Sequence, residues 1–173
     1  VKLASRSSGK DINMEQIDYN DKAVLDSIGT GRTDGIFQLE SGGMESFMKE
    51  LKPQNLEDII AGISLYRPGP MDFIPQYIKG KNHNITYDCP QLEPILAPTY
   101  GCIVYQEQVM QIVRDLAGYT LGRSDLLRRA MSKKKGDVMK KERQSFVYGN
   151  EAEGVPGCIA NGIDEKTANK IYD

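Results

Sequence analysis

Apolar residues recur at helical spacing in several segments of this chain, and a proline or glycine closely follows most of them. Met44, Phe47, Met48 and Leu51 fall at i, i+3, i+4 and i+7, and Pro53 follows. This spacing puts the four side chains on one face of a helix, which a proline cannot continue. Runs of strand length that alternate apolar and polar residues are scarce. The pattern therefore predicts a mostly α fold with irregular loops and at most short strands.

The other predicted helices show similar spacing or begin at a residue that can cap a first turn. They are a helix capped by Asp21 with Val24, Leu25 and Ile28, one capped by Asn55 with the face Leu56, Ile59, Ile60 and Ile63, one with Tyr105, Val109, Ile112, Val113 and Leu116, one capped by Ser124 with Leu127, Ala130 and Met131, a surface helix over about 137–148, and one capped by Asp164. Residues 80–100 hold a glycine and three prolines among polar residues, which predicts an irregular surface excursion with at most short helical turns.

The length and ends of the chain lead us to expect part of a larger protein. A chain of 173 residues can form one compact domain or part of one. It starts at Val1 rather than Met, and residues 170–173 have the pattern of a helix interior. Residues 1–20 are polar and are predicted to be a linker or an irregular segment, with the folded part at 21–173. No apolar run approaches the roughly 20 residues that span a bilayer, so we expect a soluble protein.

Cysteine, histidine and acidic residues are not arranged as sites. The cysteines, Cys89, Cys102 and Cys158, are odd in number and far apart, which favours neither a disulfide framework nor zinc and is typical of a reducing cytoplasm. His83 is the single histidine and has no acidic or thiol partner at ligand spacing. No D-x-D pair occurs to hold Mg²⁺ for nucleotidyl transfer, so we expect neither a catalytic residue nor a bound metal within this chain.

A basic cluster lies between residues 123 and 143. It has nine basic residues against three acidic ones, a local charge of +6 in a chain of net charge −2. We expect these side chains to form one positive surface, which would bind a polyanion by neutralising phosphates. The alternative is a solvated helix face whose C-terminal lysines complement the helix dipole.

Two further segments carry candidate ligand-binding side chains. The turn at residues 66–70 fixes Arg67 between a helix end and two prolines, which suits a guanidinium aimed at a phosphate or a base edge, or an arginine that simply faces water. Tyr105, Gln106 and Gln108 open a helix with aromatic and amide groups that could stack on bases or bond to their edges. Alternatively, Tyr105 extends the buried face and the amides are its wet side.

Four strings in order resemble one protein family. They are FQLES at 37–41, LYRPGP at 65–70, YGCIVYQEQVMQ at 100–111 and DLLRRAMSKKK at 125–135. In order and spacing they are similar to the fingers motifs of the C-family bacterial DNA polymerase III alpha subunit, of the DnaE type. The resemblance covers about residues 21–148, and it strengthens the nucleic-acid interpretation of the basic cluster.

The resemblance implies a function and a set of residue roles. The chain would be part of the fingers of a DNA-directed DNA polymerase, with template-primer DNA, dNTPs and other replisome subunits as partners. Arg128, Arg129 and Arg67 would bind the nucleotide. The DNA contacts would come from Tyr105, Gln106, Gln108, Lys133, Lys134 and Lys135. Mg²⁺ would be held by palm aspartates outside this chain, so we expect the fragment alone to bind no metal and to be inactive.

Two interpretations of another class remain open. One is a helical DNA-binding module that needs no palm domain. The other is a non-enzymatic scaffold for protein partners, which requires the Met44, Phe47, Met48 and Leu51 face to be exposed.

Overall fold

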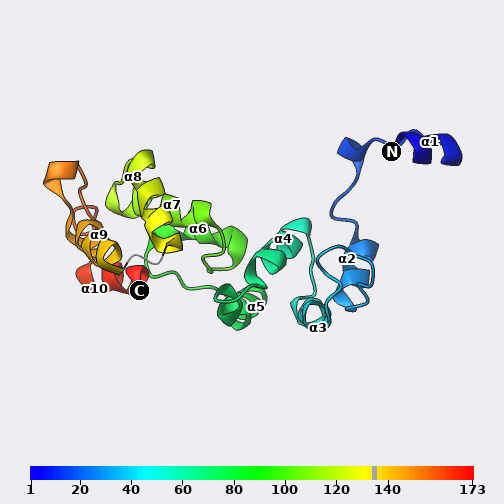
Figure 1. Cartoon of the computed structure of the whole chain (residues 1–173). Coiled ribbons are helices and arrows are strands. Elements are labelled where there is room, and N and C mark those ends of the chain that lie inside the picture. The colour runs from blue at the N-terminus through cyan, green and yellow to red at the C-terminus, as the bar shows by residue number, and fades with distance from the viewer. Residues whose placement is uncertain (134–135) are drawn as a thin grey trace. The chain divides into compact units, whose positions relative to one another are not determined.

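The computed structural model describes residues 1–133 and 136–173, and these residues are built from helices joined by loops (Figure 1). The described residues form no named strand, and their strand-like feature is an isolated antiparallel bridge between Asn150 and Val155. The predicted mostly α fold is confirmed. Among the described residues, no helix is both long enough and apolar enough to cross a membrane.

The chain divides into two compact units, residues Val1–Tyr66 and Arg67–Asp173. The first unit begins with a short helix, α1 (Lys2–Ser8), and a 3-10 turn, η1 (Met14–Gln16), neither of which has a buried residue. The role of residues 1–20 as a linker stays a prediction.

Three capped helices make up the rest of the first unit: α2 (Lys22–Gly29), α3 (Gly42–Leu51) and α4 (Leu56–Leu65). The predicted caps are confirmed. The carboxylate of Asp21 accepts hydrogen bonds from two backbone amides in the first turn of α2, at 2.9 and 3.2 Å. Asn55 accepts one from the third residue of α4 at 2.8 Å. These side chains satisfy amides that have no partner inside a helix.

The apolar face predicted for α3 is entirely buried. Met44, Phe47, Met48 and Leu51 are each at most 4% exposed. These side chains form the core of the first unit, since their removal from water is what stabilises so small a helical unit. The scaffold interpretation required them to be exposed and therefore loses its support.

α4 packs on a different face from the predicted one. The prediction is wrong because Ile60 is 46% exposed. The buried positions of α4 are instead Asp58, Ala61, Gly62 and Leu65. Gly62 gives the physical reason, since a Cβ atom there would lie 3.1 Å from the side chain of Met48 and 3.2 Å from that of Leu51. Small side chains on this face let α4 come close to α3.

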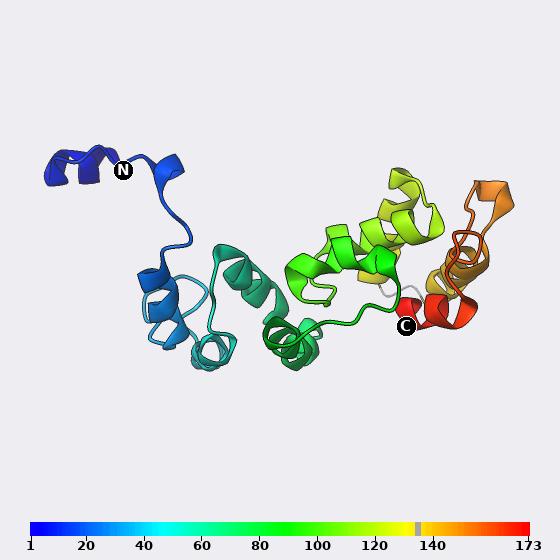
Figure 2. The ribbon, with the colours of Figure 1, turned by 180° about the vertical axis from the view of Figure 1, so that it is seen from behind.

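The second unit consists of short helices, of which those after residue 89 surround one apolar core (Figure 2). Its elements are η2 (Pro70–Phe73), α5 (Ile74–Asn82), η3 (Pro90–Leu92), α6 (Glu93–Leu96), η4 (Ala97–Thr99), α7 (Gln106–Ala117), α8 (Leu121–Ser132), α9 (Gly136–Tyr148), η5 (Glu151–Glu153) and α10 (Glu165–Tyr172). α7 packs against α8, and α9 packs against α10, with α8 also touching α9. The predicted cap of α10 is confirmed, because Asp164 accepts a hydrogen bond from the amide of Thr167.

Two predictions for this unit need correction. The short helical turns expected in residues 80–100 are present, but the segment is no surface excursion, because Leu92, Ile95 and Leu96 lie in the core. α8 starts one turn earlier than predicted, with Thr120 as its cap. Ser124 lies inside the helix, fully buried, and donates its hydroxyl to the carbonyl of the residue three positions earlier at 2.7 Å.

α9 covers the predicted segment but is not wholly a surface helix. Its first residues are exposed, whereas Phe146 and Val147 near its end are at most 1% exposed and belong to the core. The helix therefore enters the core at its C-terminal end, where it runs on to the loop that carries Cys158.

Candidate nucleic-acid interface

α7 and α8 pack against each other and carry four of the predicted site residues: Gln106, Gln108, Arg128 and Arg129. Gly118 ends α7 in the left-handed region at φ 76°, which a glycine adopts without strain. The hydroxyl of Thr120 then accepts a hydrogen bond from the amide of Arg123 and starts α8. Leu116 from α7 and Leu127 from α8 are buried in the shared core. This packing fixes which side chains of α8 can reach outward.

Arg128 links α8 to the start of α7. Its Nε and Nη2 atoms donate to one carboxylate oxygen of Asp125, at 2.9 and 2.7 Å, and its Nη1 atom donates to Oε1 of Gln106 at 3.0 Å. The side chain is 26% exposed. Arg128 and Gln106, predicted respectively for nucleotide and for DNA, are therefore brought together, and most of the guanidinium is already engaged.

Arg129 is the more accessible arginine of the pair. Its Nε atom forms an ion pair with the other carboxylate oxygen of Asp125 at 2.8 Å, while the side chain remains 63% exposed. Within the part of the chain that the structure describes, its two outer amino groups make no hydrogen bond or ion pair. Two parallel N–H groups of this kind match a phosphate or a carboxylate.

The carboxylate of Asp125 lies between the two arginines and was not among the predicted site residues. The hydrogen bond from Arg128 is the main cause that lowers the pKa of Asp125, and the nearby charge of Arg129 adds to it. The side chain is therefore ionised at neutral pH. Its spacing of three and four residues from the arginines is the spacing of helix neighbours, so the sequence held a signal for this contact.

Gln108 has a structural role in this geometry. It is 7% exposed, and its Oε1 atom accepts hydrogen bonds from the backbone amides of Val104 and Tyr105 at 2.8 and 2.9 Å. Its Nε2 atom donates to the carbonyl of Ile95 at 3.2 Å and to the hydroxyl of Thr99 at 2.7 Å. With both ends of the amide engaged, no group is left to reach a base edge, and the predicted contact with DNA is not carried forward.

Three of the other predicted residues are described by the structure and lie on the surface or at its edge. Tyr105 is the half-buried N-cap residue of α7, and Arg67 and Lys133 are exposed. Lys134 and Lys135 lie outside the described residues. The ligand contacts predicted for all five stay predictions.

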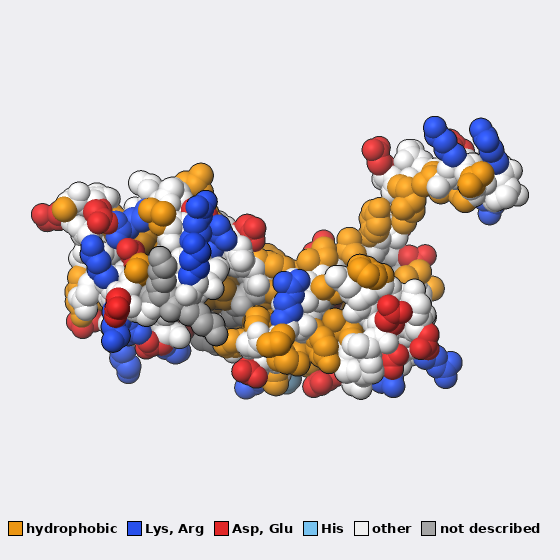
Figure 3. All heavy atoms as spheres, in the orientation of Figure 1, with side chains coloured by type: hydrophobic (Ala, Val, Ile, Leu, Met, Phe, Trp, Pro, Cys, Tyr) orange, Lys and Arg blue, Asp and Glu red, His pale blue; other side chains and the backbone are white. Residues whose placement is uncertain are grey.

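The described part of the basic cluster is interrupted by ion pairs and is not the single positive surface that we expected. Arg123 pairs with Glu142 at 3.1 Å and with Glu153. Arg143 pairs with Asp173. Basic and acidic side chains accordingly alternate over this part of the molecule (Figure 3). The partners of Arg123 are 19 or more residues away in sequence, so no local spacing could have revealed these pairs.

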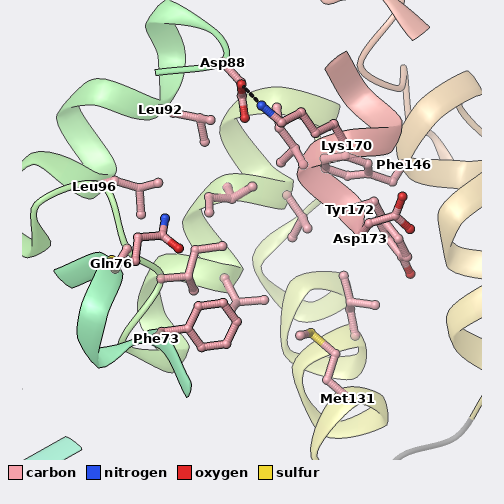
Figure 4. Close-up of a pocket in the computed structure, with 18 of the residues that line it drawn as sticks. Phe73, Gln76, Asp88, Leu92, Leu96, Met131, Phe146, Lys170, Tyr172 and Asp173 are labelled. Atoms are coloured by element: carbon pink, nitrogen blue, oxygen red, sulfur yellow. Dashed lines mark hydrogen bonds and ion pairs between the residues drawn. The ribbon is translucent and has the colours of Figure 1, made fainter. Parts of the chain in front are cut away.

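A pocket of about 480 Å³ lies in the second unit, lined mainly by apolar side chains from α6 to α10 (Figure 4). At its rim, Lys170 forms an ion pair with Asp88, while Gln76 and Asp173 add polar atoms. Among the described residues of the lining, the single basic side chain, Lys170, is already paired, and two carboxylates lie beside it. The pocket is therefore unsuited to a polyphosphate, which needs several unpaired donors.

Comparison with known proteins gives one consistent family. The family described as bacterial DNA polymerase III alpha subunit finger domain matches residues 1–154. The DNA polymerase III subunit alpha of Halalkalibacterium halodurans is 48% identical over 175 residues and covers 100% of this chain. The proteins of that name from Staphylococcus epidermidis and Staphylococcus aureus are 48% and 46% identical and cover 94% and 95% of it. This chain spans 15% of the length of each of these relatives.

The fold and the site define a helical module in which one exposed arginine, Arg129, has two outer amino groups of the kind that match a phosphate. The chain belongs to the bacterial DNA polymerase III alpha subunit finger domain family. The family expected from the four motifs is therefore confirmed, and the family match reaches further toward the N-terminus than the motifs do.

Proposed function

We propose that this chain is the part of the fingers of a bacterial replicative DNA polymerase that positions the incoming dNTP and the template-primer DNA. Nucleotidyl transfer itself would be carried out by a palm domain outside this chain. The observation that carries the proposal is the exposed, outward-facing guanidinium of Arg129, anchored at one nitrogen and open at the other two. Family membership makes the triphosphate its natural ligand.

The arginines would act by electrostatic positioning. A rigid pair of N–H donors stabilises the charge of the outer phosphates of a triphosphate, without forming a covalent bond, and this keeps the α-phosphate in line with the primer 3′ hydroxyl. Arg129 would contribute the direct contact, with Arg128 behind it and Arg67 as a further nucleotide contact. Lys133, next to the end of α8, would neutralise a DNA phosphate, and Lys134 and Lys135 would do the same.

Metal chemistry is not part of what this chain would do. Among the described residues, no three His, Cys, Asp or Glu side chains lie together so that they could hold a metal ion. No step of the proposal is assigned to Mg²⁺ here. We expect the chain alone to be inactive in DNA synthesis. Its wider setting would be the cytoplasmic replisome, with the other polymerase III subunits as partners.

The salt dependence of DNA binding tests the proposed DNA contacts. Fluorescence anisotropy of labelled template-primer would compare the longer subunit that carries this chain with a variant in which Lys133, Lys134 and Lys135 are alanine. Each lost phosphate contact lowers the slope of log affinity against log salt by about 0.9, so a reduction of about two to three is expected. The matched control replaces three exposed lysines elsewhere, Lys2, Lys10 and Lys166. Equal slopes for the two triple variants would contradict the assignment.

A further inference from the structure

An acidic side chain stands at the centre of the proposed phosphate site. Asp125 uses one carboxylate oxygen for Arg128 and the other for Arg129. On charge alone, an aspartate here should weaken the binding of a triphosphate, since it cancels part of the positive charge that the ligand meets. Its presence between the two arginines therefore calls for a geometric explanation.

The contacts of Asp125 fix the direction of both guanidinium groups. Arg129 is held at Nε, the guanidinium nitrogen nearest its backbone, and its two outer amino groups have no partner among the described residues. Arg128 is held at two nitrogens by Asp125 and at the third by Gln106 of α7. An arginine side chain that is fixed before its ligand arrives loses less conformational freedom on binding.

We propose that Asp125 is a positioning residue that holds Arg128 and Arg129 in the orientation in which the outer amino groups of Arg129 receive a nucleoside triphosphate. Arg128 and Gln106 tie this arrangement to α7, so the donor pair moves with α7 and α8 as a whole. The inference rests on the proposed function, because it requires the triphosphate to bind at Arg129.

Charge and positioning predict opposite results when Asp125 is neutralised. Asp125→Asn keeps the size of the side chain but turns one oxygen into an NH₂ group, which repels the guanidinium that it faces. If Asp125 only offsets positive charge, this substitution makes the site more attractive to a triphosphate and lowers the KM for dNTP. If it positions the arginines, the KM rises despite the gain of positive charge.

The test is steady-state nucleotide incorporation by the longer subunit that carries this chain. For Asp125→Asn we expect the KM for dNTP to rise about threefold to fivefold, the usual contribution of a partly exposed ion pair, with a smaller change in kcat. Asp137→Asn on α9 is the matched control, because Asp137 is exposed and its loss changes the net charge equally. A KM for Asp125→Asn at or below that of the control would overturn the proposal.

A double-mutant cycle with Arg129→Ala identifies the route of the effect. If Asp125 acts through the arginines, most of its effect on KM disappears once Arg129 is alanine. A full effect in that background would also overturn the proposal. Arg129→Ala by itself distinguishes failure of the proposed function from failure of the positioning role. If this variant does not raise the KM, the proposed function has failed. If it raises the KM but Asp125→Asn has no effect, only the positioning role has failed.

A second variant guards against a general loss of structure. Asp125→Glu keeps the charge and both acceptor oxygens one methylene further out, so its KM should lie between wild type and Asp125→Asn. If Asp125→Glu and Asp125→Asn have equal KM values and equal losses of thermal stability, Asp125 has a merely structural role and the proposal is refuted.

Discussion

Replacement of Gln108 by alanine should destabilise the second unit without a direct effect on ligand binding. The side-chain oxygen of Gln108 is the acceptor for two consecutive backbone amides just before α7, and its NH₂ group reaches the η3–η4 segment through Ile95 and Thr99. Alanine removes all four hydrogen bonds at a site that is 7% exposed. Water can replace few of them there.

The magnitude follows from the number of bonds and the burial of the site. A hydrogen bond contributes about 1 kcal/mol net, and a buried donor left without its acceptor costs about 1–3 kcal/mol. Thr99 keeps part of its bonding, because its hydroxyl also donates to the carbonyl of Cys102. We therefore expect Gln108→Ala to lower the free energy of unfolding by about 2–4 kcal/mol.

Urea denaturation followed by circular dichroism measures this change, with the urea midpoint as the readout. Gln111→Ala is the matched control, because Gln111 is an exposed amide on the same helix and should shift stability by less than about 0.5 kcal/mol. If Gln108→Ala unfolds at the same urea concentration as the control and instead weakens DNA binding, the structural role argued for this side chain is refuted.

Two further predictions concern a helix cap and the buried thiols. Asp21→Ala should cost about 1 kcal/mol in the same urea assay, because it removes the cap of α2, whereas Asp26→Ala, which breaks an exposed ion pair with Lys22 on that helix, should cost at most about 0.5 kcal/mol. Burial raises the pKa of Cys102 to about 11 and that of Cys158 to about 12. The folded state therefore favours the neutral form of both thiols. Their contribution to the free energy of unfolding is fully present below the ordinary pKa of 9.0 and is lost as the pH rises above it. Alkylation at pH 8 should be slow until urea unfolds the chain, and rapid labelling of the native protein would contradict this.

Local sequence signals predicted the fold where a helix has one clear apolar face. α3 is the best example, since spacing identified all four of its buried residues and Pro53 identified its end. The caps at Asp21 and Asn55 were also predictable, because a short polar side chain before an apolar pattern has a specific hydrogen-bonding role there.

The predictions were wrong for segments in which tertiary packing decides which side chains are buried. α4 has more than one possible face, and the small residue Gly62, not the largest apolar side chains, sets which face approaches α3. Leu92, Ile95 and Leu96 sit in a proline-rich segment without clear periodicity, yet they fill the core of the second unit.

In the candidate site, too, the sequence identified some residues, whereas their contacts depend on the fold. The motif at 125–135 located Arg128 and Arg129. The helical spacing of Asp125 from both arginines was a signal for its two ion pairs, but residue type alone could not show them. Gln106 and Gln108 look equivalent in the sequence, whereas burial separates an exposed partner of Arg128 from a structural amide. The ion pairs that divide the basic cluster join distant parts of the chain and depend on the fold.

The affinity of the longer subunit for a dNTP, compared with that for the matching deoxynucleoside monophosphate, tests the central claim most directly. Binding would be measured on a template-primer with a terminated 3′ end, for wild type, Arg129→Ala and the control Arg6→Ala, an exposed arginine on α1. The account predicts that Arg129→Ala weakens triphosphate binding about tenfold, the value of one charge-assisted contact, and leaves monophosphate binding and the control almost unchanged. Unchanged triphosphate affinity in Arg129→Ala, or an equal loss for both nucleotides, would contradict it.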